Sequence, residues 1–150
     1  PGGENASIDR MMNETATRET FRIKGESTIT VNDYQNGRKF DDALCYSFYP
    51  IDLHTKNGVI PKHLKRGVVP TIPRGSLIPK GSTNLMVAGR CLSSDRLANS
   101  AARVQASCMG MGQAAACTAV LAAKSSTTPK EVPLGEIHSL LREHGAIVPA

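Results

Sequence analysis

The order of apolar and polar positions predicts short strands in the first half of the chain. Residues 20–23 and residues 27–31 alternate between apolar and polar side chains, which is the period of a half-buried strand. Residues 41–49 are rich in apolar and aromatic side chains and predict a further strand. Residues 55–83 contain repeated Pro and Gly, so we expect mostly irregular structure there.

Two short helices are predicted beside these strands. Residues 8–12 place apolar side chains at the i, i+3, i+4 spacing of one helical face. Thr30 or Asn32 is suited to cap a second helix, which runs through Tyr34. Gly37 is expected to stop that helix, because glycine readily adopts the left-handed conformation found after helix ends.

The second half of the chain predicts a buried strand and a terminal helix. Residues 84–88 form a short apolar run closed by Gly89, which is typical of a strand buried on both faces. Residues 134–141 carry apolar side chains at helical spacing and predict an amphipathic helix that Gly145 stops.

A long helix is expected between these two elements. It should begin near Asn99 or Ser100 and run to about Lys124. Residues 104–123 carry no charge, so this helix is long and apolar enough to be compared with a transmembrane span. Its many Gly, Ala and polar residues favour a helix buried inside a globular protein over one that crosses a membrane.

The composition agrees with a globular domain or a piece of one. The 150 residues are 40% hydrophobic and 21% charged, which excludes a collagen-like, coiled-coil or fully disordered chain. Aromatic residues make up only 4%, so aliphatic side chains and Ala must fill the core. The predicted fold class is an α/β or α+β fragment. The net charge of +5 is modest, and the basic residues have no aromatic side chains beside them that could stack on bases. We therefore expect no nucleic-acid binding.

The cysteines predict free thiols. None of the four forms a C-x-x-C pair or clusters with the His residues along the sequence, so we expect no metal site. Reduced, buried thiols are the expectation, which favours a cytoplasmic location. The four are Cys45, Cys91, Cys108 and Cys117.

The turn around residues 99–103 is a candidate anion site. If the long helix starts there, its N-terminal amides and positive dipole end would favour an anion. Arg103 would then lie in the first helical turn, where the dipole disfavours a cation unless an anion or carboxylate is close. A solvated arginine is the alternative, and the sequence leaves both open.

Two further patterns have a chemical and a structural interpretation. Asp52 and His54 alternate along an extended segment, so they point to one face and can form an acid/base pair or a structural hydrogen bond. Gly110 and Gly112 match a loose dinucleotide-binding pattern, but they lie inside a predicted helix. We therefore assign the two glycines to close helix packing.

Several motifs then occur in a familiar order. After a segment at residues 18–25 come GRKFDD at 37–42, YPIDLH at 49–54, SLIPKG at 76–81, NLMVAGRC at 84–91, RV at 103–104 and MGMGQAA at 109–115. This set resembles the C-terminal part of FAD-dependent oxidoreductases with a glutathione-reductase-type Rossmann domain, and in particular their uncharacterised, heterodisulfide-reductase-like subgroup.

The resemblance implies a two-domain parent protein. Residues 1–83 would be the end of a substrate or cap region with its return crossing, and residues 84–150 would be the last strand and helices of the FAD-binding domain. The glycine-rich loop that holds the pyrophosphate would lie upstream. We therefore expect FAD in the parent protein and no tight FAD binding by this chain alone.

The resemblance also assigns roles to residues and partners. It places the flavin beside a set of seven residues. It assigns no catalytic residue, so Asp52 and His54 stay candidates for catalysis through their alternation alone. The expected partners are a small-molecule substrate and either the N-terminal part of the same protein or another copy of the chain, with no membrane and no nucleic acid. The seven are Gly89, Arg90, Asn99, Ser100, Ala101, Ala102 and Arg103.

Two function classes remain open on the sequence. The chain is either part of a flavoenzyme that transfers hydride or electrons on an unknown substrate, or a non-enzymatic structural or interaction module derived from such a protein.

Overall fold

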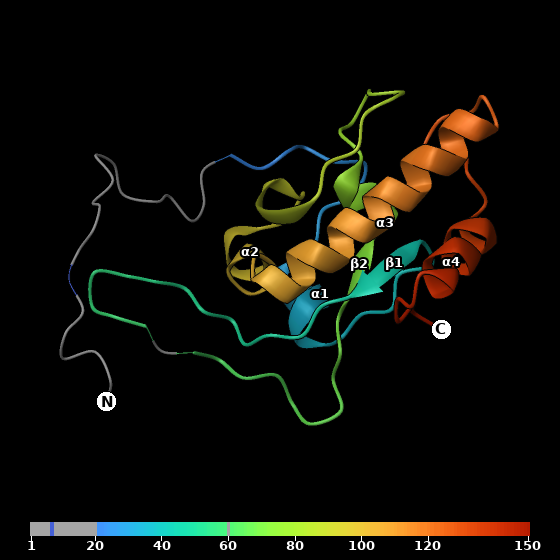
Figure 1. Cartoon of the computed structure of the whole chain (residues 1–150). Helices are drawn as coiled ribbons and strands as arrows, with labels where there is room; N and C mark the ends of the chain where they lie inside the picture. The colour runs from blue at the N-terminus through green and yellow to red at the C-terminus, as the bar shows by residue number, and fades with distance from the viewer. Residues whose placement is uncertain (1–6, 8–20, 60) are drawn as a thin grey trace.

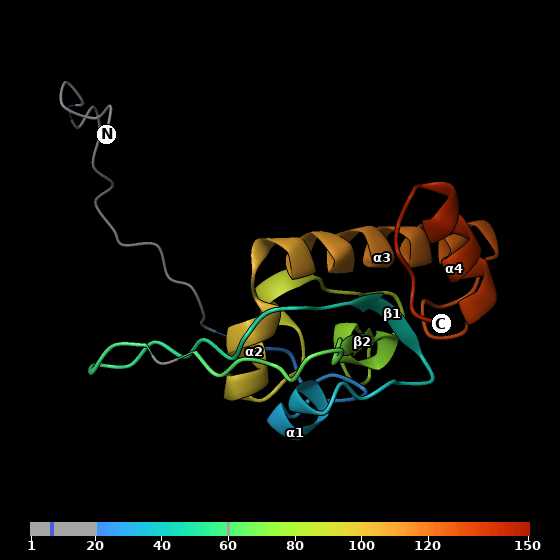
Figure 2. The same cartoon turned by 90° about the horizontal axis from the view of Figure 1, so that it is seen from below.

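The computed structural model describes residue 7 and residues 21–59 and 61–150 (Figures 1 and 2). The helix predicted at residues 8–12 lies outside these residues. The elements in chain order are α1 (Val31–Gln35), β1 (Ala43–Tyr46), β2 (Thr71–Pro73), the 3-10 helices η1 (Arg74–Leu77) and η2 (Gly89–Cys91), then α2 (Arg96–Ala102), α3 (Gln105–Lys124) and α4 (Leu134–Glu143).

A small antiparallel sheet lies at the centre of this arrangement. β1 pairs with β2 in a register that places Cys45 opposite Ile72 and Tyr46 opposite Thr71. α3 packs against β1, and α4 packs against α3. In Figure 2, α3 runs along one side of the sheet while α1 lies on the other. The fold therefore mixes helices with a small sheet, as the sequence predicted.

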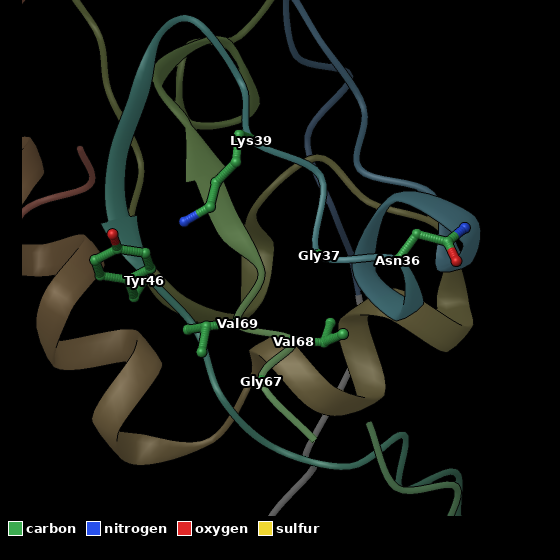
Figure 3. Close-up of a pocket in the computed structure, with 7 residues that line it drawn as sticks. All are labelled: Asn36, Gly37, Lys39, Tyr46, Gly67, Val68 and Val69. Carbon is green, nitrogen blue, oxygen red and sulfur yellow. The ribbon is translucent and has the colours of Figure 1, made fainter. Parts of the chain in front are cut away.

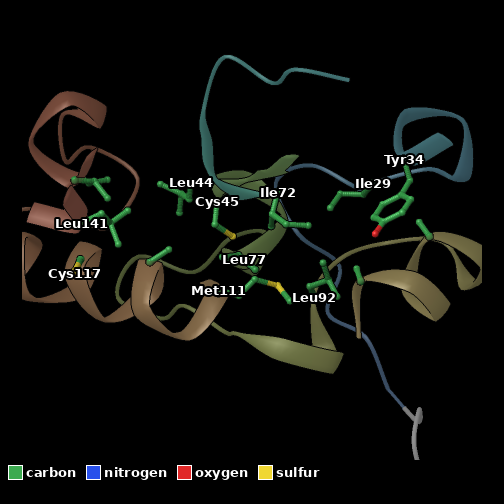
Figure 4. Close-up of a cluster of buried hydrophobic side chains, with 14 of the residues drawn as sticks. Ile29, Tyr34, Leu44, Cys45, Ile72, Leu77, Leu92, Met111, Cys117 and Leu141 are labelled. Carbon is green, nitrogen blue, oxygen red and sulfur yellow. The ribbon is translucent and has the colours of Figure 1, made fainter. Parts of the chain in front are cut away.

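One hydrophobic core joins both halves of the chain (Figure 4). Leu44 from β1 and Ile72 from β2 are 0% exposed, as are Leu77 and Leu92 from the segments that follow. Met111 of α3 is also 0% exposed and closes the core from the helix side. The predicted boundary between residues 83 and 84 thus falls between two segments that share this core, and it remains a prediction.

Local sequence signals define α1 and α4. Thr30 caps α1, and its hydroxyl accepts a hydrogen bond from the Asp33 amide while the Asp33 carboxylate accepts one from the Thr30 amide. Gly37 follows with a φ of 62°, so the predicted stop is confirmed. The terminal helix is confirmed as well, and Gly145 ends it with a φ of 75°.

The strand predictions are right only in part. Residues 43–46 within the predicted 41–49 form β1, whereas residues 21–31 make isolated bridges at Gly25 and Ile29 and no strand. The stretch 55–83 is mostly irregular, as expected, but its residues 71–73 form β2.

The prediction of a buried strand at residues 84–88 is wrong. This segment is irregular and partly exposed, and Leu85 is 52% exposed. The Val87 amide donates to the Leu77 carbonyl at 2.8 Å, but no neighbouring strand in the described residues extends this single bond into a ladder. An apolar run becomes a strand only when a partner strand satisfies its backbone groups.

The prediction of one helix from residue 99 is also wrong. α2 begins at Arg96, after its N-cap Asp95, and ends at Ala102. Val104 is extended, with φ −69° and ψ 155°, and serves as the N-cap of α3. The β-branched side chain of Val104 lowers helix propensity at this point, which is consistent with the break. Asn99 and Ser100 therefore lie inside a helix and do not start one.

α3 buries one side only. Met111, Ala114 and Thr118 are fully buried, whereas Met109 is 74% exposed and Val120 is 47% exposed. α3 is the one helix in the described part of the chain that is long and apolar enough to cross a membrane, and 33% of its apolar window is buried. The structure therefore buries one face of the long apolar helix and leaves the opposite face partly exposed.

Residues 23–29 pass between two later segments of the chain at very short distances. The Ser27 amide donates to the Gly75 carbonyl at 3.1 Å, and the Ile29 amide donates to the Ser93 carbonyl at 3.1 Å. A Cβ atom on Gly25 would lie 2.7 Å from the Ser93 Cβ and 2.8 Å from the Gly75 oxygen. Only a residue without a side chain fits at this crossing.

We expect Gly25→Ala to destabilise the fold by about 1–3 kcal/mol, the usual cost of forcing a methyl group into a packed site. Urea unfolding measures this change. Gly135→Ala is the control, because a Cβ there meets nothing within 4 Å and should leave stability unchanged or raise it by about 0.5–1 kcal/mol through helix propensity. Equal stability of the Gly25 variant and the parent chain would contradict the close crossing.

Candidate functional site

Polar contacts fix the position of α2. The Asp95 carboxylate accepts hydrogen bonds from the Ala98 amide, at 2.8 Å, and from the Val31 amide of α1. Asn99 is fully buried, and its Nδ2 donates to the Arg90 carbonyl at 3.0 Å and to the Ser94 hydroxyl at 3.2 Å. These bonds hold α2 against the loop that carries η2.

The C-terminal end of α2 meets the segment that contains Asp52. The Asp52 amide donates to the Ser100 hydroxyl at 3.1 Å, and the Arg103 Nη2 donates to the Asp52 carbonyl at 3.1 Å. Two candidate groups that are about 50 residues apart in sequence therefore form one cluster. We call Asp52, His54, Ser100 and Arg103 the 52–103 cluster.

The Asp52 carboxylate faces His54. The His54 Nε2 lies 3.5 Å from Asp52 Oδ2, so the predicted pairing of these two side chains is present. The side chain of His54 is 46% exposed and that of Asp52 is 22% exposed. Asp52 contacts α2 through its backbone, and its carboxylate lies beside the His54 imidazole. This geometry suits either of the two predicted roles.

Arg103 lies at a different helix end from the one predicted. It is the C-cap of α2, where the negative end of the dipole favours a cation, so the argument from an unfavourable first turn is wrong. A different observation now singles out Arg103: its Nε is buried and has no hydrogen-bond partner among the described residues. An unpaired buried donor on a guanidinium is costly, and an added acceptor would satisfy it.

The other predicted flavin neighbours differ in accessibility. Arg90 is exposed, and Gly89 is buried with a φ of 84°. Asn99, Ala101 and Ala102 are 0% exposed, and Ser100 is 1% exposed. Within this chain the arginines are the members of the predicted set whose side chains reach the surface. The buried members support the cluster from inside.

Gly110 and Gly112 occupy the interior of α3. A Cβ on Gly110 would lie 3.7 Å from the Cys45 side chain, while one on Gly112 would meet nothing within 4 Å. Gly110 thus marks the contact between α3 and β1, as the packing interpretation predicted, whereas that interpretation is wrong for Gly112.

A separate cavity lies between α1 and β1, and the sequence analysis missed it (Figure 3). It has a volume of about 350 Å³, and Lys39 Nζ lies over the Tyr46 ring at 4.6 Å from the centroid. Figure 3 shows Lys39 pointing towards Tyr46, whereas Asn36 on α1 points away from both. The polar groups do not converge on one point, so the cavity lacks the arrangement that a specific ligand site needs.

Asp95 was also missed, although a sequence signal for it exists. An Asp directly before an apolar helical run is a standard N-cap pattern. This pattern predicts a helix that starts at residue 96, with Arg103 near its C-terminal end. In the part of the chain that the structure describes, no three His, Cys, Asp or Glu side chains are grouped to hold a metal ion.

The comparison with protein families decides the broader class. A family model described as FAD dependent oxidoreductase matches residues 1–141, almost the whole chain. The chain belongs to the FAD-dependent oxidoreductase family. A search of curated proteins and a search of solved structures found no match. Membership of this family supports a flavin-linked redox function and implies FAD as the cofactor of the family.

We expect Ser100→Ala in this FAD-dependent oxidoreductase chain to release the Asp52 segment from α2. The variant removes the acceptor of the Asp52 amide, so exchange of that amide with deuterium should become about 2- to 10-fold faster, the equivalent of one hydrogen bond. The Ile51 amide, which donates to the Lys62 carbonyl, is the internal control and should not change. Unchanged exchange at Asp52 would show that the cluster does not depend on Ser100.

Proposed function

We propose that this chain is the C-terminal part of an FAD-dependent oxidoreductase and that the 52–103 cluster faces the flavin. The observation that carries the proposal is the unpaired Nε of Arg103 beside the Asp52–His54 pair, in a chain of a flavin-dependent family. The remainder of the FAD-binding domain comes from the N-terminal part of the same protein or from another copy of the chain. The substrate is a small molecule.

The residues of the cluster fit an electron-rich flavin edge. Arg103 donates through Nη2 to the Asp52 carbonyl, and its partly exposed side chain brings a positive charge to the surface of the cluster. Arg90 adds a second cation at the end of the loop that follows residues 84–88. When bound, FAD takes up two electrons from a substrate and gains negative charge in doing so. Arginines near that charge stabilise it.

His54 is suited to handle a proton next to this position. Its imidazole is held by the Asp52 carboxylate and is half exposed, so a substrate hydroxyl or amine can reach the ring. A carboxylate beside one ring nitrogen orients the imidazole. His54 would therefore accept a proton from the substrate, and Asp52 would position His54.

We expect Arg103→Ala in the FAD-containing protein to lower the two-electron potential of the flavin. A charge-assisted hydrogen bond is worth about 1.5–3 kcal/mol, and the potential falls by about 30 mV for each ~1.4 kcal/mol of lost stabilisation. Redox titration followed by flavin absorbance measures the shift. Arg66→Ala, at an exposed arginine of the 61–70 loop, is the control of equal charge change. Equal potentials for the Arg103 variant and the parent protein would contradict the proposal.

Arg103→Lys separates charge from geometry. If the planar guanidinium is required, the lysine variant should resemble the alanine variant, whereas a purely electrostatic role should preserve part of the potential.

We expect His54→Gln to slow substrate oxidation about 10²- to 10⁴-fold, the usual contribution of general acid–base catalysis, without moving the flavin potential. Stopped-flow reduction of the flavin by substrate measures the rate. A potential shift in this variant, or an unchanged rate, would show that His54 has no proton-transfer role.

A further inference from the structure

Two of the four thiols lie at the contact between η2 and α3. Cys91 is the last residue of η2, and Cys108 lies near the start of α3. Both are half-buried, whereas Cys45 and Cys117 are buried. Solvent can therefore reach the first two thiols far more easily than the other two.

The backbone brings the two residues into the same small region. Gly89 opens η2, and a Cβ on this glycine would lie 3.6 Å from the Cys108 Sγ. Cys91 follows two residues later in the same 3-10 turn, which advances by about 2 Å per residue. The 3-10 helix and α3 pack directly on each other. Cys91 and Cys108 therefore lie on two elements that are in direct contact.

Neither thiol is held by a strong interaction. The Cys108 Sγ donates to the Arg103 carbonyl at 3.3 Å, and the Cys91 Sγ donates to the Ala88 carbonyl at 3.5 Å. Thiol hydrogen bonds of this kind are weak, so little is lost when the sulfur atoms change partners.

The charges around Cys108 connect it with the same turn. Burial raises the pKa of the Cys108 thiol, the Arg90 cation lowers it, and the charge of Cys91 raises it. The two thiols are thus close enough to affect each other electrostatically, and a cation lies within range of Cys108. Burial alone raises the pKa of Cys45, to about 12, so that thiol stays protonated.

We propose that Cys91 and Cys108 form a redox-active dithiol that exchanges with small-molecule disulfides. The thiolate of one cysteine attacks a sulfur of the small disulfide, forms a mixed disulfide and releases one small thiolate. The thiolate of the second cysteine attacks the protein sulfur of that mixed disulfide, forms the Cys91–Cys108 bond and releases the second small thiolate. The two protein protons pass through solvent to the released thiolates, so two protein thiols are oxidised while one small disulfide is reduced.

This site is independent of the flavin role proposed above. It requires only the contact between η2 and α3, and failure of FAD to bind would leave it unaffected. Its oxidation would tie η2, which carries Gly89 and Arg90, to the first turns of α3.

The test is peptide mapping of the native 150-residue chain after equilibration with mixtures of oxidised and reduced glutathione. Acid quenching, alkylation and trypsin digestion follow. Because residues 104–124 form one tryptic peptide that holds both Cys108 and Cys117, the mapping uses the Cys117→Ala variant. We expect the peptide of residues 91–96 to become linked to the peptide of residues 104–124, with a loss of about 2 Da relative to the sum of the two reduced peptides, because one disulfide replaces two thiols.

Matched variants identify the pair. Cys108→Ser and Cys91→Ser should each stop at the mixed disulfide on the remaining cysteine, whereas Cys45→Ala should form the Cys91–Cys108 bond as the parent does. Oxidation of the chain unfolded in guanidinium, followed by the same digestion, shows whether selective pairing of Cys91 with Cys108 needs the fold. In the unfolded chain all thiols should pair without preference. Full alkylation of Cys91 and Cys108 at every ratio of oxidised to reduced glutathione would overturn the proposal. Pairing without preference in the native chain would overturn it as well.

Discussion

The close passage of residues 23–29 between two later segments is the contact on which the remaining structure depends. Backbone hydrogen bonds join Ile23 to Cys91 and Ile29 to Ser93 on one side, and Ser27 to Gly75 on the other. At Gly25 the backbones approach so closely that a methyl group would collide with Ser93. This passage fixes the loop before α2. A larger residue at Gly25 collides with neighbouring atoms, whereas the surrounding aliphatic core can tolerate swaps between side chains of similar volume.

From that loop the site follows through a short series of polar contacts. Asp95 caps α2 and also binds the first turn of α1, and Asn99 returns to the Arg90 carbonyl. α2 then ends where Ser100 and Arg103 hold the main chain of Asp52. A main-chain group takes part in each of these bonds, and the Asp52 carboxylate lies 3.5 Å from the His54 imidazole. A site held by its backbone keeps its side chains for chemistry.

Local signals in the sequence were enough for α1 and α4. The Thr30 cap and Gly37 define α1, whereas the amphipathic spacing of residues 134–141 and Gly145 define α4. Residues 84–88 show the opposite case, since an apolar run becomes a strand only with a partner that the run itself does not specify. The pairing of Asp52 with His54 was predictable from their alternation, but its contact with Ser100 is not encoded locally. The sequence signal at Asp95, the N-cap of α2, could have predicted that a separate short helix starts at residue 96 and precedes the break at Val104.

The central claim is that Arg103 and the Asp52–His54 pair form one flavin-facing site. The most direct measurement is a crystal structure of the FAD-bound protein that contains this chain together with the segments that complete its cofactor domain. We expect a flavin atom within hydrogen-bond distance of the Arg103 guanidinium, with His54 on the substrate side of the ring. A flavin bound elsewhere, with the 52–103 cluster open to solvent or covered by other protein, would contradict it.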